Sequence, residues 1–328
     1  MTTYLIRRLL LTVPTLLLIS MLSFLIMEAP PGDFVTSYIT AEAQRTESAS
    51  MSSVEEELRK AWGLDKPLHI RYLRWIGHLL RGDLGYSLSW RAPVKEIVAS
   101  RFVTSMVISL SSTLFVWTVG FPIGIYSATH QYSIPDRFWT LIGFLGLSIP
   151  DFLLALVLLY SSNVLFGISI GGLFSTEYLR ASWSLAKVVD LLKHVWIPIV
   201  VIGTAGTAGL IRITRANLLD ELGKSYVEMA RAKGLSERRL VFKYPVRIAI
   251  NPFISSVGWV LPGIVFGEVI VSVVLGLPTA GPLFLEALLT QDMQLAGAYL
   301  MLISVFTIAG VFLSDILLAI VDPRIRYT

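Results

Sequence analysis

The sequence predicts an all-α, polytopic membrane protein with six transmembrane helices. Of 328 residues, 54% are hydrophobic and only 15% are charged, whereas an average soluble protein is about 25% charged. The charged residues lie between long uncharged runs, and a transmembrane helix needs about 17 to 25 mostly apolar residues. The predicted spans cover residues 9–27, 102–128, 138–160, 195–211, 248–267 and 295–317. Because the chain contains no cysteine, disulfide scaffolds, thiolate metal sites and thiol redox chemistry are excluded.

The first predicted span follows Arg7 and Arg8, as the apolar region of a secretory signal would. The apolar run over 9–27 is longer than the usual signal region of about 7 to 15 residues, and the sequence EAPP from Glu28 has no small-x-small cleavage site. We therefore expect a retained first transmembrane helix, with a removed secretory signal as the alternative.

The segment 29–101 between the first two spans is predicted to hold two helices. Ser52 and Ser53 each precede a glutamate by three residues, which is a capping-box pattern, and Gly63 can end the helix that follows. A second helix is expected over 67–80, with an apolar stripe that comprises Leu68, Tyr72, Ile76 and Leu79. This stripe fits two roles, a helix on the outer membrane surface or a small external cap packed on the spans.

Lysine and arginine are concentrated in the loops of one membrane side. The loop 212–247 holds nine of them, whereas the loop 268–292 holds none. Under the positive-inside rule, the loop 212–247 and both chain termini are expected on the cytoplasmic side of the cell membrane. The net charge of +4 follows from this topology, so the expected partner is the lipid bilayer and no nucleic acid.

The loop 212–247 predicts a helix-turn-helix. An apolar series recurs at helical spacing, formed by Leu218, Leu222, Tyr226, Met229 and Ala230. Gly234 can take the left-handed position that ends this helix, with Leu235 as the hydrophobic contact that follows. Ser236 can then cap a second helix that begins with Glu237. The basic side chains around the turn fit two roles, binding to anionic lipid headgroups or docking of a cytoplasmic partner; they are Arg231, Lys233, Arg238 and Arg239.

The residues from Tyr226 to Arg239, YVEMARAKGLSERR, resemble the cytoplasmic EAA loop of ABC importer permeases. Glu228, Ala230 and Gly234 match the family pattern, and Met229 replaces its second alanine. Four further segments, in the order found in the dipeptide/oligopeptide-type branch of this family, extend the resemblance over nearly the whole chain. They are YLIRRLLLTVPTLLLISMLSF from Tyr4, PGD at 31–33, WGLDKPLHIRYLRWIGHLLRGDLGYSL from Trp62 and DPRIR from Asp322.

The resemblance implies a type I ABC importer transmembrane domain. Its expected parts are the cytoplasmic N-terminus with the first helix (1–28), an extracytoplasmic segment (29–101), a five-helix permease core that contains the EAA-like loop (102–321), and a cytoplasmic tail (322–328). The residues expected to couple the permease to its ATPases are Glu228, Ala230, Arg231, Lys233, Gly234, Leu235, Ser236, Glu237 and Arg238.

The resemblance also implies the partners. Family members work with a second, similar permease subunit, so a heterodimer is expected, and with two cytoplasmic ATPases and an extracellular binding protein. This chain is expected to be non-catalytic, because Gly223-Lys224-Ser225 lacks the first glycine of a phosphate-binding loop at position 218, which is leucine. ATP and Mg²⁺ are then bound by the partner ATPases, and this chain holds no cofactor and no metal. ATPase closure is expected to push the loop and drive alternating access.

Two acidic residues are candidates for the translocation path or its gate, because a charge inside a span is costly and counts as a functional hypothesis. Asp151 lies about 20 Å into its span at 1.5 Å per residue, next to Pro150. A place on the path and a buried pair with a neighbouring subunit are both open for it. Glu268 lies at the outer end of the fifth span. It fits three roles: part of a gate, a contact with the binding protein, or a solvated charge at the membrane interface.

The substrate class has two candidates. The resembling branch mostly imports di- and oligopeptides, which are the expected substrates. Oligosaccharides are the alternative, because the chain has only three Asn and four Gln, a depletion found in thermophilic proteins. An alternative of another class is an ion-coupled carrier, which needs paired broken helices and several intramembrane acids. A membrane scaffold explains the spans but not the EAA-like loop.

Overall fold

The computed structural model describes residues 2–29, 39, 56–57, 59–60, 63–87, 89–167, 171–256, 263 and 269–321. Over these residues the regular structure is helical, apart from two strands of two residues each. The expected all-α fold is confirmed. The chain divides into two compact units, Met1–Val103 with Ala280–Ala309 and Thr104–Thr279 with Gly310–Thr328.

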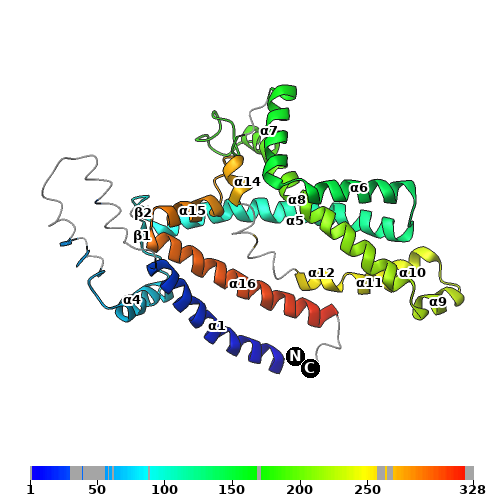
Figure 1. The fold of residues 1–328 in the computed structure, drawn as a ribbon, viewed down its shortest axis with the longest axis horizontal. Coiled ribbons are helices and arrows are strands. Elements are labelled where there is room, and N and C mark those ends of the chain that lie inside the picture. The colour runs from blue at the N-terminus through cyan, green and yellow to red at the C-terminus, as the bar shows by residue number, and fades with distance from the viewer. Residues whose placement is uncertain are drawn as a thin grey trace. The chain divides into compact units, whose positions relative to one another are not determined.

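The elements follow one another as Figure 1 shows. In chain order they are α1 (Thr2–Glu28), α4 (Leu68–Leu80), β1 (Tyr86–Ser87), β2 (Ala92–Pro93), α5 (Val94–Thr129), α6 (Ile134–Ser148), α7 (Asp151–Phe166), α8 (Leu185–Leu222), α9 (Ser225–Ala232), α10 (Glu237–Lys243), α11 (Pro245–Ala249), α12 (Asn251–Ser256), α14 (Val269–Val274), α15 (Ala280–Leu289) and α16 (Met293–Val321).

In the first unit, α4 packs against α1. The Tyr72 hydroxyl lies 2.8 Å from the Ser20 hydroxyl, and the Tyr72 ring meets the Phe24 ring edge-on at 5.5 Å between centroids. Arg71 donates to Glu28 at 2.6 Å. The contact with Ser20 places Tyr72 of the predicted stripe against α1, whereas Leu68 of the same stripe is exposed, and the role of the stripe stays a prediction. On the rest of the helix, Leu73 and Leu80 are exposed.

The residues before α4 end a helical turn as the sequence predicts. Gly63 has a φ of +67°, and the Leu64 amide donates to the Arg59 carbonyl at 2.9 Å, which is the bond pattern of a glycine-terminated helix. The predicted capping residues Ser52 and Ser53 lie outside the described residues.

Asp292 ties the short β1–β2 hairpin to the start of α16. One of its carboxylate oxygens accepts from the hydroxyls of Ser87 at 2.6 Å and Ser89 at 2.7 Å. The other oxygen accepts from the Leu295 amide at 3.1 Å and so caps α16. Because Asp292 is buried, these bonds position the loop that leads into α5.

Among the described residues, three helices are long and apolar enough to cross a membrane: Leu10–Glu28, Val94–Thr129 and Met293–Leu317. These match the predicted spans 9–27, 102–128 and 295–317. The predicted span 195–211 lies inside α8, and the span 248–267 continues beyond α12 into residues that are not described. The total of six spans stays a prediction.

The predicted span 138–160 falls on two helices with a sharp bend between them, and whether the pair crosses the membrane as one span stays a prediction. α6 and α7 together form an apolar pair, but the pair is bent by 102° at a short break. Ile149 is extended, with φ −85° and ψ 122°, as a residue before proline prefers. Pro150 has no N–H with which to continue the helix. Asp151 therefore begins α7 directly after the break instead of lying within a continuous helix.

The second unit is built around α8, which has 38 residues. One apolar cluster joins it to α7, α14 and α5, and contains Ile108, Ala155, Val195, Ile197, Val201, Val271, Leu275 and Leu277. A second cluster lies at the end of α8 and joins it to α9, α10 and α11; it contains Ala128, Leu218, Val227, Ala230, Leu240, Val241, Val246 and Ala249. The first cluster packs on the first half of α8 and the second on its C-terminal end.

Candidate functional site

The end of α8 carries a helical hairpin, residues 225–243, formed by α9, a turn and α10 (Figure 1). The apolar series from Leu218 to Ala230 predicts one helix, and this expectation was wrong. α8 ends at Leu222, and Lys224 is extended with φ −83° and ψ 148° before α9 starts. The helical spacing continues across the break because both helices bury their apolar faces in the same cluster.

Glu221 holds this break in place. Its carboxylate accepts hydrogen bonds from the Lys224 amine and from the Tyr226 hydroxyl, the latter at 2.6 Å. Burial raises the pKa of Glu221, but the bonds from Lys224 and Tyr226 outweigh burial and bring the pKa below its ordinary value. Burial, followed by the bond to Glu221, raises the pKa of Tyr226. At neutral pH the carboxylate is therefore charged and the phenol protonated, which is the pairing that orients α9.

The turn of the hairpin is a Schellman motif, as the sequence predicts. Gly234 has a φ of +79°. The Gly234 amide donates to the Arg231 carbonyl at 3.0 Å, and the Leu235 amide donates to the Ala230 carbonyl at 3.4 Å. Leu235 packs against the apolar cluster at the base of the hairpin. A Cβ built on Gly234 meets no atom within 4 Å, so the left-handed backbone and not crowding requires glycine here.

An ion pair closes the hairpin across this turn. The Arg231 guanidinium donates through two nitrogens to the Glu237 carboxylate, and the second contact is 3.2 Å long. The pair lowers the pKa of Glu237. Ser236 occupies the N-cap position of α10 in extended conformation, but its side chain makes no capping bond. The expectation that its hydroxyl caps α10 was therefore wrong, and Glu237 is bonded to Arg231 instead.

The two faces of the hairpin differ sharply. Val227 and Leu240 are completely buried against α8. Met229, predicted on the buried stripe, is 59% exposed, because α9 starts after a break and faces another direction than α8. The exposed face carries charges of both signs around the turn, and its residues are Glu228, Arg231, Lys233, Gly234, Ser236, Glu237 and Arg238. A solvent-facing surface of this kind, held on a buried apolar base, can bind a partner protein.

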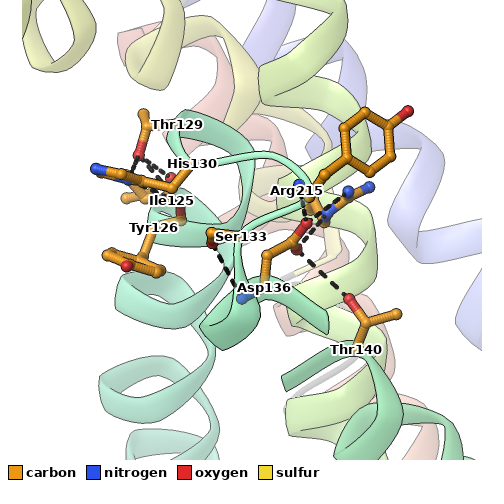
Figure 2. Close-up of polar contacts among 9 residues, drawn as sticks. Ile125, Tyr126, Thr129, His130, Ser133, Asp136, Thr140 and Arg215 are labelled. Carbon is orange, nitrogen blue, oxygen red and sulfur yellow. Dashed lines mark hydrogen bonds and ion pairs between the residues drawn. The ribbon is translucent and has the colours of Figure 1, made fainter. Parts of the chain in front are cut away.

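A buried ion pair that the sequence analysis did not find lies nearby on α6 and α8 (Figure 2). The Asp136 carboxylate accepts from the Arg215 guanidinium at 2.8 Å and 3.0 Å. It also accepts from the Tyr132 amide at 2.9 Å, and the Ser133 hydroxyl caps the Asp136 amide. Asp136 is 2% exposed. Only the pattern Ser-Ile-Pro-Asp, a helix start with an acid in its first turn, marks Asp136 in the sequence.

The two acids predicted for the path have different outcomes. Asp151 is half-buried at the first turn of α7, and among the described residues no hydrogen bond or ion pair to its carboxylate is found. It lies on the same helix face as Ala155 and Ser162, which are buried. Glu268 lies outside the described residues. Across the described part of the chain, no group of three or more metal-ligating side chains comes together.

Comparison with known proteins gives two family matches. The model of the binding-protein-dependent transport system inner membrane component matches residues 120–327, and the model of the N-terminal region of the same membrane component matches residues 1–111. The first match contains the hairpin, Asp136, Asp151 and Arg215.

Individual relatives cover the whole chain. The oligopeptide transport system permease protein AppB of Bacillus subtilis is 35% identical over 100% of both chains. The glutathione transport system permease protein GsiC of Salmonella paratyphi A is 31% identical over 100% of both chains. A putative peptide permease protein of Brucella ovis is 31% identical over 99% of both chains.

Proposed function

The chain belongs to the family of binding-protein-dependent transport system inner membrane components, and from this premise we propose that it moves di- and oligopeptides from a binding protein into the cytoplasm. It is a permease subunit of an ABC importer and has no catalytic activity of its own. Relatives named for oligopeptide and glutathione transport favour peptides over oligosaccharides as its substrates. They also favour an importer over an ion-coupled carrier.

The observation that carries the coupling mechanism is the exposed turn at Gly234 on a hairpin with a buried base. In our proposal the partner ATPases bind the residues around this turn, from Glu228 to Arg238, and push the hairpin when they close on ATP. The buried contacts of Val227 and Leu240 with α8 pass the push to α8, because a packed core transmits displacement with little deformation. The membrane domain then switches from outward to inward facing.

The complete importer needs further subunits. Permeases of this family work with ATPase subunits and a binding protein. We propose that two ATPases bind ATP and Mg²⁺, and that a second, homologous permease completes a heterodimer. The concentration of Lys and Arg in the loop 212–247 supports a cytoplasmic hairpin with both termini on the same side. The chain is embedded in the cell membrane.

The path is proposed to pass Asp151, at the break between α6 and α7, and Glu268 is proposed to lie at its outer gate. A carboxylate without a partner among the described residues is costly in a membrane interior, and the amino group of a peptide can neutralise it. Asp151→Asn keeps the side-chain volume and removes the charge. We expect peptide uptake to fall about tenfold, the loss that about 1.4 kcal/mol of attraction produces, with unchanged ATPase association. Radiolabelled peptide uptake into proteoliposomes measures this.

Glu177→Gln is the matched control for this substitution, because Glu177 is an exposed acid in the loop before α8. It is expected to transport normally. If Asp151→Asn separates the two permease subunits but leaves uptake per assembled complex unchanged, Asp151 forms a pair with the neighbouring subunit and does not line the path.

The substrate class is tested by ATPase activity of the complete complex in proteoliposomes. The permease pair, its ATPases and the binding protein are titrated separately with mixed oligopeptides and with mixed oligosaccharides. We expect stimulation by peptides only. Stimulation by oligosaccharides alone would overturn the proposed substrate while leaving the importer intact, and the absence of any bound ATPase would overturn the coupling mechanism.

A further inference from the structure

The Asp136–Arg215 pair has the properties of a rigid connection between two helices. The guanidinium meets the carboxylate through two nitrogens (Figure 2), which fixes both distance and orientation. The same carboxylate is anchored to its own turn by the Tyr132 amide. Asp136 is almost completely buried, whereas the Arg215 side chain is 25% exposed, so removing Arg215 leaves a buried carboxylate without its cation.

The contact between α6 and α8 continues along both helices above this pair. Gly143 and Gly146 are buried on the face of α6 that carries Asp136. A Cβ placed on Gly143 would lie 3.9 Å from the Cβ of Ala208, and one placed on Gly146 would lie 3.0 Å from the Thr204 methyl group. Because Gly143 and Gly146 have no side chains, the two helices can approach each other closely.

The pair lies between the hairpin and the α6–α7 break in the chain. Arg215 lies two turns before the end of α8 at Leu222, where the hairpin begins. Asp136 lies in the first turn of α6, and α6 ends at the break before Pro150 and Asp151. Packed helices move as rigid bodies, whereas a break without a continuous hydrogen-bond ladder absorbs a change of angle.

We propose that the Asp136–Arg215 pair locks α6 to α8, so that a displacement of the hairpin reaches the α6–α7 break at Asp151. The pair consists of positioning residues, since neither touches the ATPase turn or the substrate. The proposal rests on the function proposed above. It predicts that α6 and α8 keep their relative position throughout the transport cycle and that loss of the pair uncouples ATP hydrolysis from uptake.

A cross-link tests whether α6 and α8 stay together. The separation of 3.9 Å between a Cβ on Gly143 and that of Ala208 falls in the disulfide range of about 3.5 to 4.5 Å, and the chain has no cysteine of its own. Gly143→Cys with Ala208→Cys, oxidised in the complete complex, is expected to keep uptake within about twofold of the reduced sample, a change below the usual range of coupling effects. Loss of uptake on oxidation, restored by reduction, would show that the helices slide and would overturn the proposal.

The role of the ion pair itself is tested by the number of peptides imported per ATP. Arg215→Gln and Asp136→Asn are each expected to lower this ratio about tenfold, within the usual range of coupling effects, while the ATPases stay bound. The double variant should be no worse than either single variant, because both remove one interaction. The matched control is Arg212→Gln, an exposed arginine one turn away on α8, which should keep the ratio.

The decisive sample combines Arg215→Gln with the cysteine pair. Oxidation should restore the ratio, because the disulfide replaces the lost connection, and reduction should abolish it again. An Arg215→Gln complex that is fully coupled without the disulfide contradicts the lock. A failure of the proposed function would instead be seen in the wild-type complex. There the ATPases would not bind, or peptides would not stimulate ATP hydrolysis.

Discussion

Replacing Gly234 with valine is expected to reduce ATP-driven uptake about a hundredfold, with normal expression of the chain. Gly234 has a φ of +79°, and forcing a side chain into such a backbone costs about 1 to 3 kcal/mol, most for a β-branched residue. The turn relieves this strain by leaving the left-handed conformation, which breaks the bonds that orient Arg231 and Leu235. Uptake into proteoliposomes and the amount of ATPase that co-purifies measure the effect.

Two substitutions calibrate this result. Gly223→Ala lies in the same loop, but Gly223 has a φ of −82°, and an added Cβ makes only ordinary contacts with the Asp220 and Leu219 carbonyls at 3.8 Å and 4.0 Å, so uptake should stay near normal. Gly234→Asn should be intermediate, because asparagine tolerates the left-handed region. Unchanged uptake in Gly234→Val would contradict the proposed docking role of the turn.

Leu240→Ala is expected to destabilise the hairpin by about 2 to 5 kcal/mol, the cost of a cavity in a packed core. Leu240 is completely buried between α10 and α8 and packs in the cluster that contains Leu218 and Val227. A hairpin detached from α8 cannot pass on a push, so we expect loss of coupled uptake together with a lower melting temperature. Thermal unfolding of the purified complex and ATPase retention check both effects.

Met229→Ala is the matched control, because it shortens an apolar side chain on the same hairpin that is 59% exposed. Its melting temperature should not change. If the ATPases bind the exposed face, this variant loses ATPase without losing stability. If Leu240→Ala melts like the wild type, the buried base does not hold the hairpin, and the route from hairpin to α8 is wrong.

The sequence predicted those features that depend on local composition and backbone conformation. Three apolar runs became long apolar helices, and Gly63 and Gly234 both take the left-handed conformation that ends a helix. The helix over 67–80 also formed after Pro67. The same local reasoning failed at Leu222, where the helix ends although the apolar residues continue at helical spacing. Such spacing indicates which face of a segment is buried, but not whether its backbone is one continuous helix.

By itself, then, the sequence determined which segments are apolar enough to enter a membrane, where the hairpin turns and which family pattern the chain resembles. Only the tertiary structure decided that α6 and α7 meet at 102° and that Asp136 pairs with Arg215, 79 residues later. The physical reason is that hydropathy and φ preferences belong to single residues and their neighbours. A buried ion pair instead depends on the relative position of two helices, which the packing of glycine and apolar side chains along their whole contact sets.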